Sequence, residues 1–422
     1  MKFVLAFYGT RGDVEPGIAV GRELVRRGHD VRMAVPPDLV GFAESAELTA
    51  MAYGPDNQQW LEVTRNFWKR FFRNFWRIQE LKWLLRESRE PGIQCWGEMS
   101  SMLTSLVDGA DLLLTGMSYQ ELAVNVAEYR DIPLATLLWF PVRVNGHVVP
   151  ILPAPLIRSA MTAYEWLVWG GVRKVEGTQR RELGLPKAKG LSSRRIAERG
   201  SLEIQAYDEV CFPGLAAEWA KWDGQRPFVG ALTMELSTDA DEEVASWIAA
   251  GTPPIFFGFG STPVKSPADT IAMISAVCAQ LGERALVCAA GTDFSHVPHF
   301  DHVKVVGAVN FAATFPACRA VVHHGGAGTT AAGLRAGVPT LILWTLPDQL
   351  IWGAQVKRLK VGTARRFSTT TRESLVADLR RILAPQYVTR AREIASRMTT
   401  PAVSVAAAAD LLEDTARLGR FG

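Results

Sequence analysis

The chain has 422 residues, 48% of them hydrophobic, and this length exceeds the size at which one hydrophobic core usually stops growing, so we expect two domains. Its 46 basic and 43 acidic residues leave a net charge of only +3, which excludes nucleic acid as a general partner on electrostatic grounds. The substrate therefore has to be inferred from a site.

The cysteine pattern and the N-terminal sequence both predict that the protein lies in the reducing interior of the cell. The five cysteines have neither metal-ligand spacing nor the pattern of a disulfide framework. The apolar stretch MKFVLAFYG runs into a charged, glycine-rich turn without a cleavage site, and the sequence has no run of about twenty apolar residues. We expect a cytoplasmic protein.

The first quarter of the chain alternates short β-rich runs with helical patterns, which is typical of a parallel sheet wrapped by helices. We expect a strand at 3–8 and a helix at 16–28, with Pro16 in the first turn and Gly28 at the C-terminal cap. Further strands are expected in HDVRMAVP, LTAMAYG, ADLLLTG and PLATLLW. These elements predict an N-terminal Rossmann-like domain over residues 1–215.

A second β/α alternation starts at PPIFFGFGS (253–261) and predicts another Rossmann-like domain over 228–400. The tryptophans, glycines and prolines near 212–228 lack a clear period and read as a linker. The stretch 401–422 predicts a helix that packs back on the N-terminal domain. The expected fold class is α/β.

The stretch HHGGAGTT (323–330) ends an apolar strand and opens a helix. Such a turn leaves backbone N–H groups free at the positive end of the helix dipole, where an anion can bind. Its glycines let a phosphate approach the backbone, and His324 can add a ring N–H donor. A tight turn with a satisfied histidine is the simpler interpretation of these residues alone.

A second polar pair follows at the end of the next strand, in LPDQ (346–349). An acid and an amide at the carboxyl edge of a neighbouring strand can accept from and donate to sugar hydroxyls, and this edge is where open α/β sheets bind ligands. The order of the two motifs favours a nucleotide-sugar site over a plain turn.

Together, HHGGAGTT, GVPTLILW and LPDQ resemble the donor signature of the inverting GT-B glycosyltransferases that use UDP-sugars. The opening FYGTRGDVEPGIAVGRELVRRGHDV resembles their vancomycin-type, mycobacterial glycopeptidolipid and sterol-type members, so the resemblance covers nearly the whole chain. It implies two Rossmann-like domains facing a central cleft. It also implies a nucleotide diphosphate-sugar as donor substrate and no separate cofactor.

The resemblance implies donor-binding roles for specific residues. The diphosphate positions, with their neighbours in the turn, are His324, Gly325, Gly326, Ala327, Gly328 and Thr329. Ser261 matches a second phosphate contact, and the backbone around Val309 matches the nucleobase contact. Asp348 and Gln349 match the residues that bind sugar hydroxyls.

Asp13, in the turn GTRGD, has two possible roles. From the residues alone we favour a helix cap, which would stabilise the helix by about 1 kcal/mol. The resemblance implies instead a general base that takes the proton of the acceptor hydroxyl, a contribution of roughly 100- to 10,000-fold in rate. The two roles conflict in part, because a carboxylate that accepts hydrogen bonds from helix N–H groups has a lowered pKa and is a poorer base, although a hydrogen bond from the acceptor could still align the proton transfer. For Arg11 we favour steering of the anionic donor over a purely structural role.

No metal site is expected. The string DAD (239–241) resembles the metal motif of other glycosyltransferases, but it precedes EEVASWIAAG and reads as a capped, acidic helix start. The fixed dipoles of the donor turn can stabilise the charge that develops on the leaving diphosphate.

The acceptor site is less clearly marked. Residues 60–96 carry aromatic residues at three- and four-residue spacing with basic residues between them. This pattern fits a core helix with a solvated basic face, or else a lid or groove for a large apolar acceptor or a peripheral contact with the anionic lipid of a membrane. For the second possibility the candidate acceptor contacts are Phe67, Phe71, Trp76 and, in another loop, His147.

The sequence therefore predicts a glycosyltransferase that moves a hexose or deoxyhexose from a UDP- or dTDP-sugar to a hydroxyl of a hydrophobic acceptor such as a lipopeptide or glycolipid. A nucleotide-sugar epimerase of the same fold and a non-catalytic nucleotide-sugar or lipid-binding protein are the alternatives. The sequence leaves open which sugar, acceptor and oligomeric state apply.

Overall fold

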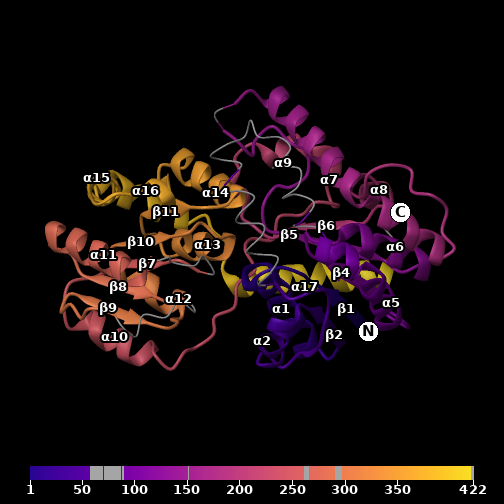
Figure 1. Ribbon diagram of the computed structural model, residues 1–422, viewed down its shortest axis with the longest axis horizontal. Helices are drawn as coiled ribbons and strands as arrows, with labels where there is room; N and C mark the ends of the chain where they lie inside the picture. The colour runs from indigo at the N-terminus through magenta and orange to yellow at the C-terminus, as the bar shows by residue number, and fades with distance from the viewer. Residues whose placement is uncertain are drawn as a thin grey trace. The chain divides into compact units, whose positions relative to one another are not determined.

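A computed structural model describes residues 1–57, 70, 87, 90–150, 152–260, 266–289 and 297–419. The chain divides into two compact units. Unit 1 comprises Met1–Glu209, Pro213–Leu232 and Thr400–Gly422, and unit 2 comprises Val210–Phe212 and Thr233–Thr399. Each unit contains its own parallel sheet (Figure 1).

The sheet of unit 1 has the strand order β3-β2-β1-β4-β5-β6 in the part of the chain that the structure describes, and neighbouring strands are parallel. The strands are β1 (Lys2–Ala6), β2 (Asp30–Val35), β3 (Thr49–Ala52), β4 (Leu112–Thr115), β5 (Leu134–Leu138) and β6 (Leu202–Gln205). The helices are α1 (Arg11–Arg26), α2 (Val40–Glu44), α5 (Trp96–Leu106), α6 (Gln120–Arg130), α7 (Ala154–Glu182), α8 (Ser192–Glu198), α9 (Leu215–Glu218) and α17 (Pro401–Leu418), with 3₁₀ turns η1 (Pro37–Leu39) and η3 (Ala220–Trp222).

Helix α1 packs closely on β1 because glycines face the strand. A methyl group at Gly17 would lie 2.5 Å from the ring of Phe7. The helix ends at a left-handed Gly28, whose N–H donates to Val25 O while the N–H of His29 donates to Leu24 O. This is a Schellman cap, as the sequence predicts.

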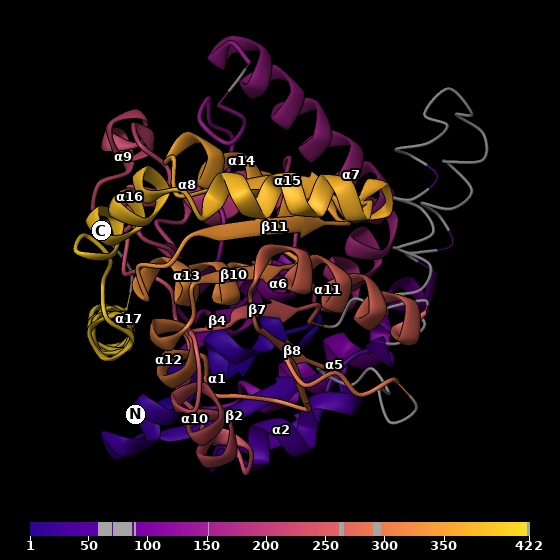
Figure 2. The ribbon, with the colours of Figure 1, turned by 90° about the vertical axis from the view of Figure 1, so that its left-hand side faces the viewer.

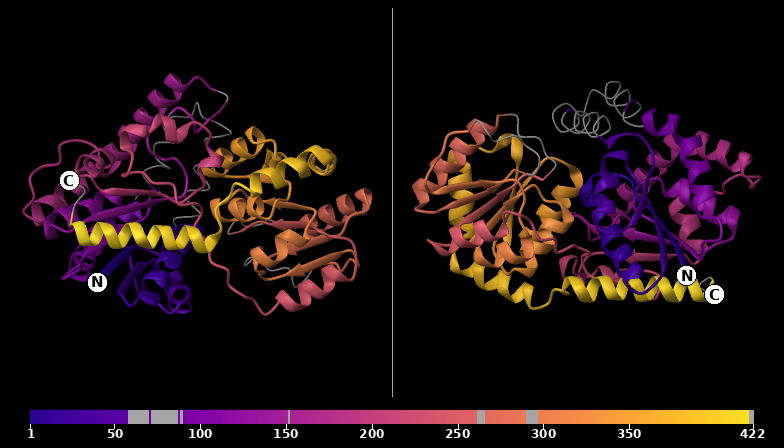
Figure 3. Two further views of the ribbon diagram at one scale, coloured as in Figure 1. Left: turned by 180° about the vertical axis from the view of Figure 1, so that it is seen from behind. Right: turned by 90° about the horizontal axis from the view of Figure 1, so that it is seen from below.

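Helix α17 belongs to unit 1 and packs on α1 (Figure 3). Arg27 at the end of α1 donates to Asp410 at 2.6 Å and to Glu413 at 3.3 Å, and the His29 ring lies 2.8 Å from Glu413. The expected return of the C-terminal helix to the N-terminal domain is therefore confirmed.

The sheet of unit 2 has the order β12-β11-β10-β7-β8-β9, again parallel throughout the described part of the unit. Its strands are β7 (Ile255–Gly258), β8 (Ala285–Cys288), β9 (Val303–Val306), β10 (Ala320–His323), β11 (Thr340–Trp344) and β12 (Gly362–Arg366). Its helices are α10 (Asp241–Ala249), α11 (Pro267–Leu281), α12 (Phe311–Thr314), α13 (Ala327–Arg335), α14 (Pro347–Arg358), α15 (Arg372–Ile382) and α16 (Pro385–Ala395), with 3₁₀ turns η4 (Phe315–Ala317) and η5 (Phe367–Thr369); η2 (Glu209–Cys211) lies where the two units meet in sequence.

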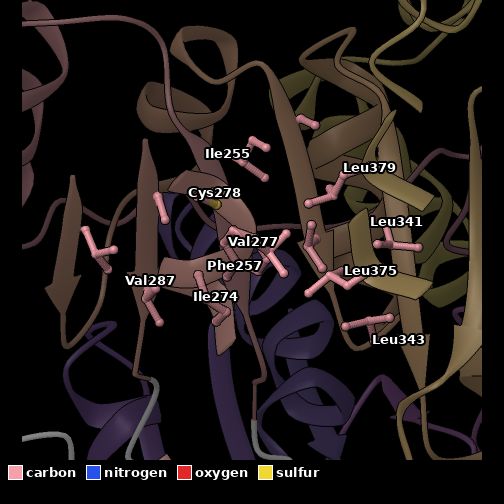
Figure 4. Packing of buried hydrophobic residues seen from close by; sticks show 14 of the residues in the cluster. Ile255, Phe257, Ile274, Val277, Cys278, Val287, Leu341, Leu343, Leu375 and Leu379 are labelled. Atoms are coloured by element: carbon pink, nitrogen blue, oxygen red, sulfur yellow. The ribbon is translucent and has the colours of Figure 1, made fainter. Parts of the chain in front are cut away.

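Alternate residues of the strands of unit 2 bury on opposite faces of the sheet. Ile255 and Phe257 pack with α11 and α15 in one apolar cluster (Figure 4), whereas Phe256 packs in a second cluster with residues of α10 and α12. A parallel sheet covered on both faces accounts for the continuous apolar runs of these strands. The expected pair of Rossmann-like sheets is confirmed.

Three local expectations were wrong. Helix α1 begins at Arg11, five residues before the expected start at Pro16, because Thr10 and Asp13 form a capping box there. Pro16 therefore lies inside the helix. The segment expected to be a linker instead runs alongside β6 and pairs with it. The backbone N–H of Gln205 donates to Pro227 O, and the backbone N–H of Val229 donates to Gln205 O. Strands β6 and β12 were not expected at all.

Within the described residues, no helix is both long and apolar enough to cross a membrane.

Candidate functional site

The turn between β10 and α13 has the geometry of an anion site (Figure 2). Gly326 is the N-cap of α13, in an extended conformation and without a side-chain cap. The N–H groups of the first turn, from Ala327 to Thr329, have no acceptor within the helix. They are oriented toward the carboxyl edge of the sheet and can bind phosphate oxygens. The hydroxyl of Thr330, by contrast, is buried and donates to Gly326 O at 2.8 Å.

His324 lies between two glycines. A methyl group at Gly260, after β7, would lie 2.4 Å from Cε1 of the His324 ring, and one at Gly326 would lie 2.6 Å from Nε2. Nε2 is thus the ring atom nearest the donor turn. Burial lowers the pKa of His324 to about 4, against the opposing effect of a hydrogen bond with the Gly258 backbone, so the imidazole is neutral at pH 7.

The neighbouring His323 shapes the same turn, a role that sequence analysis missed. Its Nδ1 accepts the N–H of Gly325 at 3.0 Å, which places the ring proton of a neutral imidazole on Nε2. Burial, together with His324, lowers the pKa of His323 well below its usual value. The two adjacent histidines of the motif were the sequence signal that could have predicted this role of His323.

Gly325 brings the two sequence motifs together. Its backbone is left-handed, with φ +98°, and a methyl group there would lie 2.7 Å from Ile342 and 3.1 Å from Cβ of Gln349. The turn after β10 therefore packs directly on the first turn of α14. Only glycine meets both requirements without strain.

Asp348 and Gln349 lie in the first turn of α14, not at the strand end itself. The side-chain oxygen of Gln349 accepts from the N–H groups of Thr345 and Leu346 at 2.7 and 3.0 Å, so it holds the turn and leaves the amide nitrogen as the group that could reach a sugar. Burial raises the pKa of Asp348, against the opposing effect of nearby N–H groups. A half-buried carboxyl of this kind can accept hydrogen bonds from sugar hydroxyls.

The side chain of Val309 is buried in an apolar cluster, so only its backbone could contact a base. The next residue, Asn310, caps α12 and donates its N–H to Asp241 at 2.8 Å. Asp241 also accepts from Thr238 N at 2.7 Å and begins α10. The string DAD is therefore a capped helix start, and no cluster of His, Cys, Asp and Glu side chains suited to a metal occurs among the described residues.

Asp13 is the third residue of α1, and its carboxylate holds the turn before the helix. Oδ2 accepts from the backbone N–H of Thr10 at 2.6 Å and from the Thr10 hydroxyl at 2.9 Å. A methyl group at Gly9 would lie 2.4 Å from the same Oδ2. Asp13 is thus part of a capping box and not the N-cap, and it is half-buried at the carboxyl edge of the unit 1 sheet.

Other polar groups gather at this edge. Asn57, after β3, donates to Gly9 O and, at 3.2 Å, to Asp38 after β2. Burial raises the pKa of Asp38. Arg11 is exposed and lies over the Phe42 ring at 4.4 Å, with Glu15 at 3.4 Å.

The acceptor candidates are only partly described. Phe67, Phe71 and Trp76, like the donor candidate Ser261, lie outside the described residues. The His147 ring lies 3.2 Å from Glu218, which also accepts from Arg158 at 2.7 Å. His147 therefore lies in a polar cluster of unit 1, next to the ion pair of Glu218 with Arg158.

Comparison with known proteins identifies the family. Residues 3–90 match the model of the glycosyltransferase family 28 N-terminal domain, and residues 271–415 match that of the erythromycin biosynthesis protein CIII-like C-terminal domain. An uncharacterized glycosyltransferase of Mycobacterium tuberculosis is 64% identical over the full length of both chains. A sterol 3-beta-glucosyltransferase of Arabidopsis thaliana is 27% identical over 94% of this chain and 65% of its own.

Solved structures show the same fold. The chain is similar to the kitacinnamycin glycosyltransferase with a TM-score of 0.70 and 17% identity, over 98% of both chains. It is also similar to a glycosyltransferase of Streptomyces sp. SF2575 in complex with thymidine diphosphate, with a TM-score of 0.62 and 20% identity over 97% of this chain and 99% of that one. The protein belongs to the GT-B glycosyltransferases, and it is an enzyme of that class.

Proposed function

We propose that the enzyme transfers a hexose or deoxyhexose from a UDP- or dTDP-sugar to a hydroxyl of a hydrophobic acceptor, with inversion at the anomeric carbon. The acceptor class is a lipopeptide, glycolipid or other natural product. The observation that carries the proposal is the packing of the glycine-rich turn after β10 on the first turn of α14 through Gly325. This packing supports the proposal because the first-turn N–H groups of α13, which suit a phosphate, lie next to the first turn of α14 with its carboxyl and amide, which suit sugar hydroxyls.

Unit 2 binds the donor in this proposal. The first-turn N–H groups of α13 and the Nε2 side of His324 contact the diphosphate, while Asp348 and the amide nitrogen of Gln349 contact the sugar hydroxyls. Negative charge that collects on the diphosphate as its bond to the sugar breaks is stabilised by these fixed dipoles. We assign no metal ion to this step. Thymidine diphosphate bound to one structural relative supports the class of donor.

Asp13 of unit 1 acts as the general base. The acceptor oxygen attacks the anomeric carbon, the bond from that carbon to the diphosphate oxygen breaks, and the acceptor proton moves to the carboxylate. Thr10 holds the carboxylate through two hydrogen bonds to Oδ2, which fixes the direction of the group.

Donor identity is tested by incubating the purified protein with a panel of UDP- and dTDP-hexoses and following the released nucleotide diphosphate by mass spectrometry. We expect release from at least one donor, faster in the presence of an apolar hydroxylated acceptor. Isomerised sugar without release of nucleotide would contradict transfer, and so would tight donor binding without turnover over a broad acceptor panel.

A further inference from the structure

The N-terminal half of α7 is apolar on several sides and yet remains exposed. Between 154 and 175 only Ile157 is fully buried, whereas the C-terminal end of the helix is anchored by buried Glu176, Gln179 and Arg180. A helix that is apolar around its circumference is normally covered by other structure. In Figure 1 this half of α7 extends beyond α6 and α8.

Exposed apolar side chains concentrate here. Of the eleven large apolar side chains exposed in the described part of the chain, five lie between 152 and 167, and they are 52–62% exposed: Leu152, Leu156, Tyr164, Trp166 and Leu167. A side chain added at Gly170, further along the helix, would meet nothing within 4 Å. Scattered single residues would need no explanation, but a cluster of this kind marks an interaction surface.

The side chains have the arrangement of an interfacial helix. At about 100° per residue, Leu156 and Leu167 fall within about 20° of each other, with the exposed Ala160 and Ala163 between them on the same stripe. Tyr164 and Trp166 lie on opposite sides of that stripe. Trp166 contacts Trp169 edge to face at 5.4 Å, and Trp169 in turn donates to Glu176 at 2.8 Å. Rings that border an apolar stripe are typical of helices at the level of lipid headgroups.

The charged residues around the apolar stripe of α7 indicate which kind of partner binds there. Exposed Arg173 and Lys174 follow the apolar stretch, and Lys174 lies five turns from Leu156 on the same side of the helix. Arg158, 44% exposed, lies within the stretch but is paired with Glu218, so it adds no net charge to the face. The only acidic residue between 154 and 175 is Glu165, which is half-buried and close to Arg143 and Ser193. The face is therefore apolar and cationic, which suits an anionic bilayer surface.

A second copy of the chain fits less well. Five half-exposed side chains of this size leave on the order of 500 Å² of apolar surface, comparable with the apolar part of the roughly 800 Å² that each partner contributes to a standard protein interface. A second copy would, however, bring the same exposed cations, Arg173 and Lys174, to the contact, whereas an anionic bilayer neutralises them. A bilayer needs no matching surface, and burial of the stripe alone is favourable by about 25 cal/mol per Å².

We propose that the exposed face formed by Leu152 and by α7 up to Lys174 docks on the surface of an anionic lipid bilayer, with the helix lying in the plane of the interface. None of its residues belongs to the glycine-rich turn of unit 2 or to the turn around Asp13. The inference does not rest on the proposed transfer reaction.

The test is flotation of the full-length protein with vesicles of phosphatidylcholine and with vesicles that also contain phosphatidylglycerol. We expect wild-type protein to float with the anionic vesicles and to bind the neutral ones at least tenfold more weakly. Leu167→Glu should lower binding at least tenfold, and Arg173→Glu should lower it on anionic vesicles only. The matched control is Val403→Glu on α17, because Val403 is 58% exposed but lies outside the proposed surface. This variant should bind lipid like the wild type.

Folding and the alternatives are measured on the same samples. All variants should keep the melting temperature and UDP or dTDP affinity of the wild type, which separates loss of lipid binding from loss of structure or of the donor site. Wild-type protein that floats with neither vesicle would overturn the proposal. A concentration-dependent dimer that Leu167→Glu dissociates, without lipid binding, would also overturn it and assign the face to a second copy.

Discussion

Replacing Gly325 with alanine tests the central packing of the proposed donor site. The left-handed backbone at this position costs an L-residue about 1–2 kcal/mol, and the added methyl group would lie 2.7 Å from Ile342, so the turn has to move. We expect a loss of about 2–3 kcal/mol, which for a unit of this size corresponds to a melting temperature lower by roughly 4–12 °C. Displacement of the N–H groups should also weaken UDP or dTDP binding by about tenfold or more.

Gly328→Ala is the matched control in the same turn. A methyl group there would meet only Thr233, at the ordinary distance of 3.6 Å, and the residue is helical, so alanine should preserve or raise the melting temperature. Differential scanning calorimetry and isothermal titration with the nucleotide diphosphate measure both effects. Gly325→Ala with wild-type stability and wild-type nucleotide affinity would refute the reasoning. Gly328→Ala controls for stability only, because the proposed diphosphate lies over the first turn of α13 and a methyl group at this position can itself weaken nucleotide affinity.

Asp13→Asn should lower kcat by roughly 100- to 10,000-fold while keeping the melting temperature, because the amide oxygen can still accept the Thr10 N–H; transfer at the wild-type rate would leave Asp13 only its capping role. His324 is expected to make the free energy of unfolding depend on pH. Its pKa is about 4 in the folded state and 6.5 in the unfolded state, so its contribution to stability is complete above pH 6.5 and is lost as the pH falls toward 4. Melting temperatures across that range should show a smaller decline in His324→Gln, and an unchanged decline would contradict the assignment. Arg27→Ala should speed amide hydrogen exchange in α17 and cost about 1 kcal/mol, whereas Arg26→Ala, whose pair with Glu23 is exposed, should change neither.

The parts of the fold that sequence analysis predicted are those with local signals. Apolar runs gave most strands of both sheets, and Gly28 marked the end of α1 through its left-handed backbone. Strand β6, LEIQ, lacked such a signal because Glu203 is polar in sequence. Its carboxylate is nevertheless fully buried between Arg143 and Arg226, a pairing that only the tertiary structure creates.

Strand β12, GTARR, was missed for a different reason. It lies at the edge of the unit 2 sheet, and its last three residues are half-buried, so neither an apolar run nor a clean alternation exists. In the donor site, the sequence predicted the glycine turn and the Asp-Gln pair but not their contact. That contact depends on the approach of Gly325 to Gln349 across two parallel strands, which spacing alone does not define.

The hydrogen bonds that make Asp13 a cap also fix the orientation of its carboxylate. A flexible surface carboxylate would have to be ordered before it could take a proton, and that ordering would cost rate. Here the two hydrogen bonds from Thr10 to Oδ2, together with the close approach that glycine permits at position 9, order the carboxylate before any substrate binds. The cap would therefore supply the alignment that the proposed base requires. It follows that Gly9→Ala, which places a methyl group 2.4 Å from Oδ2, should impair transfer while leaving nucleotide affinity at the unit 2 site unchanged; a parallel loss of nucleotide affinity would contradict this division of roles.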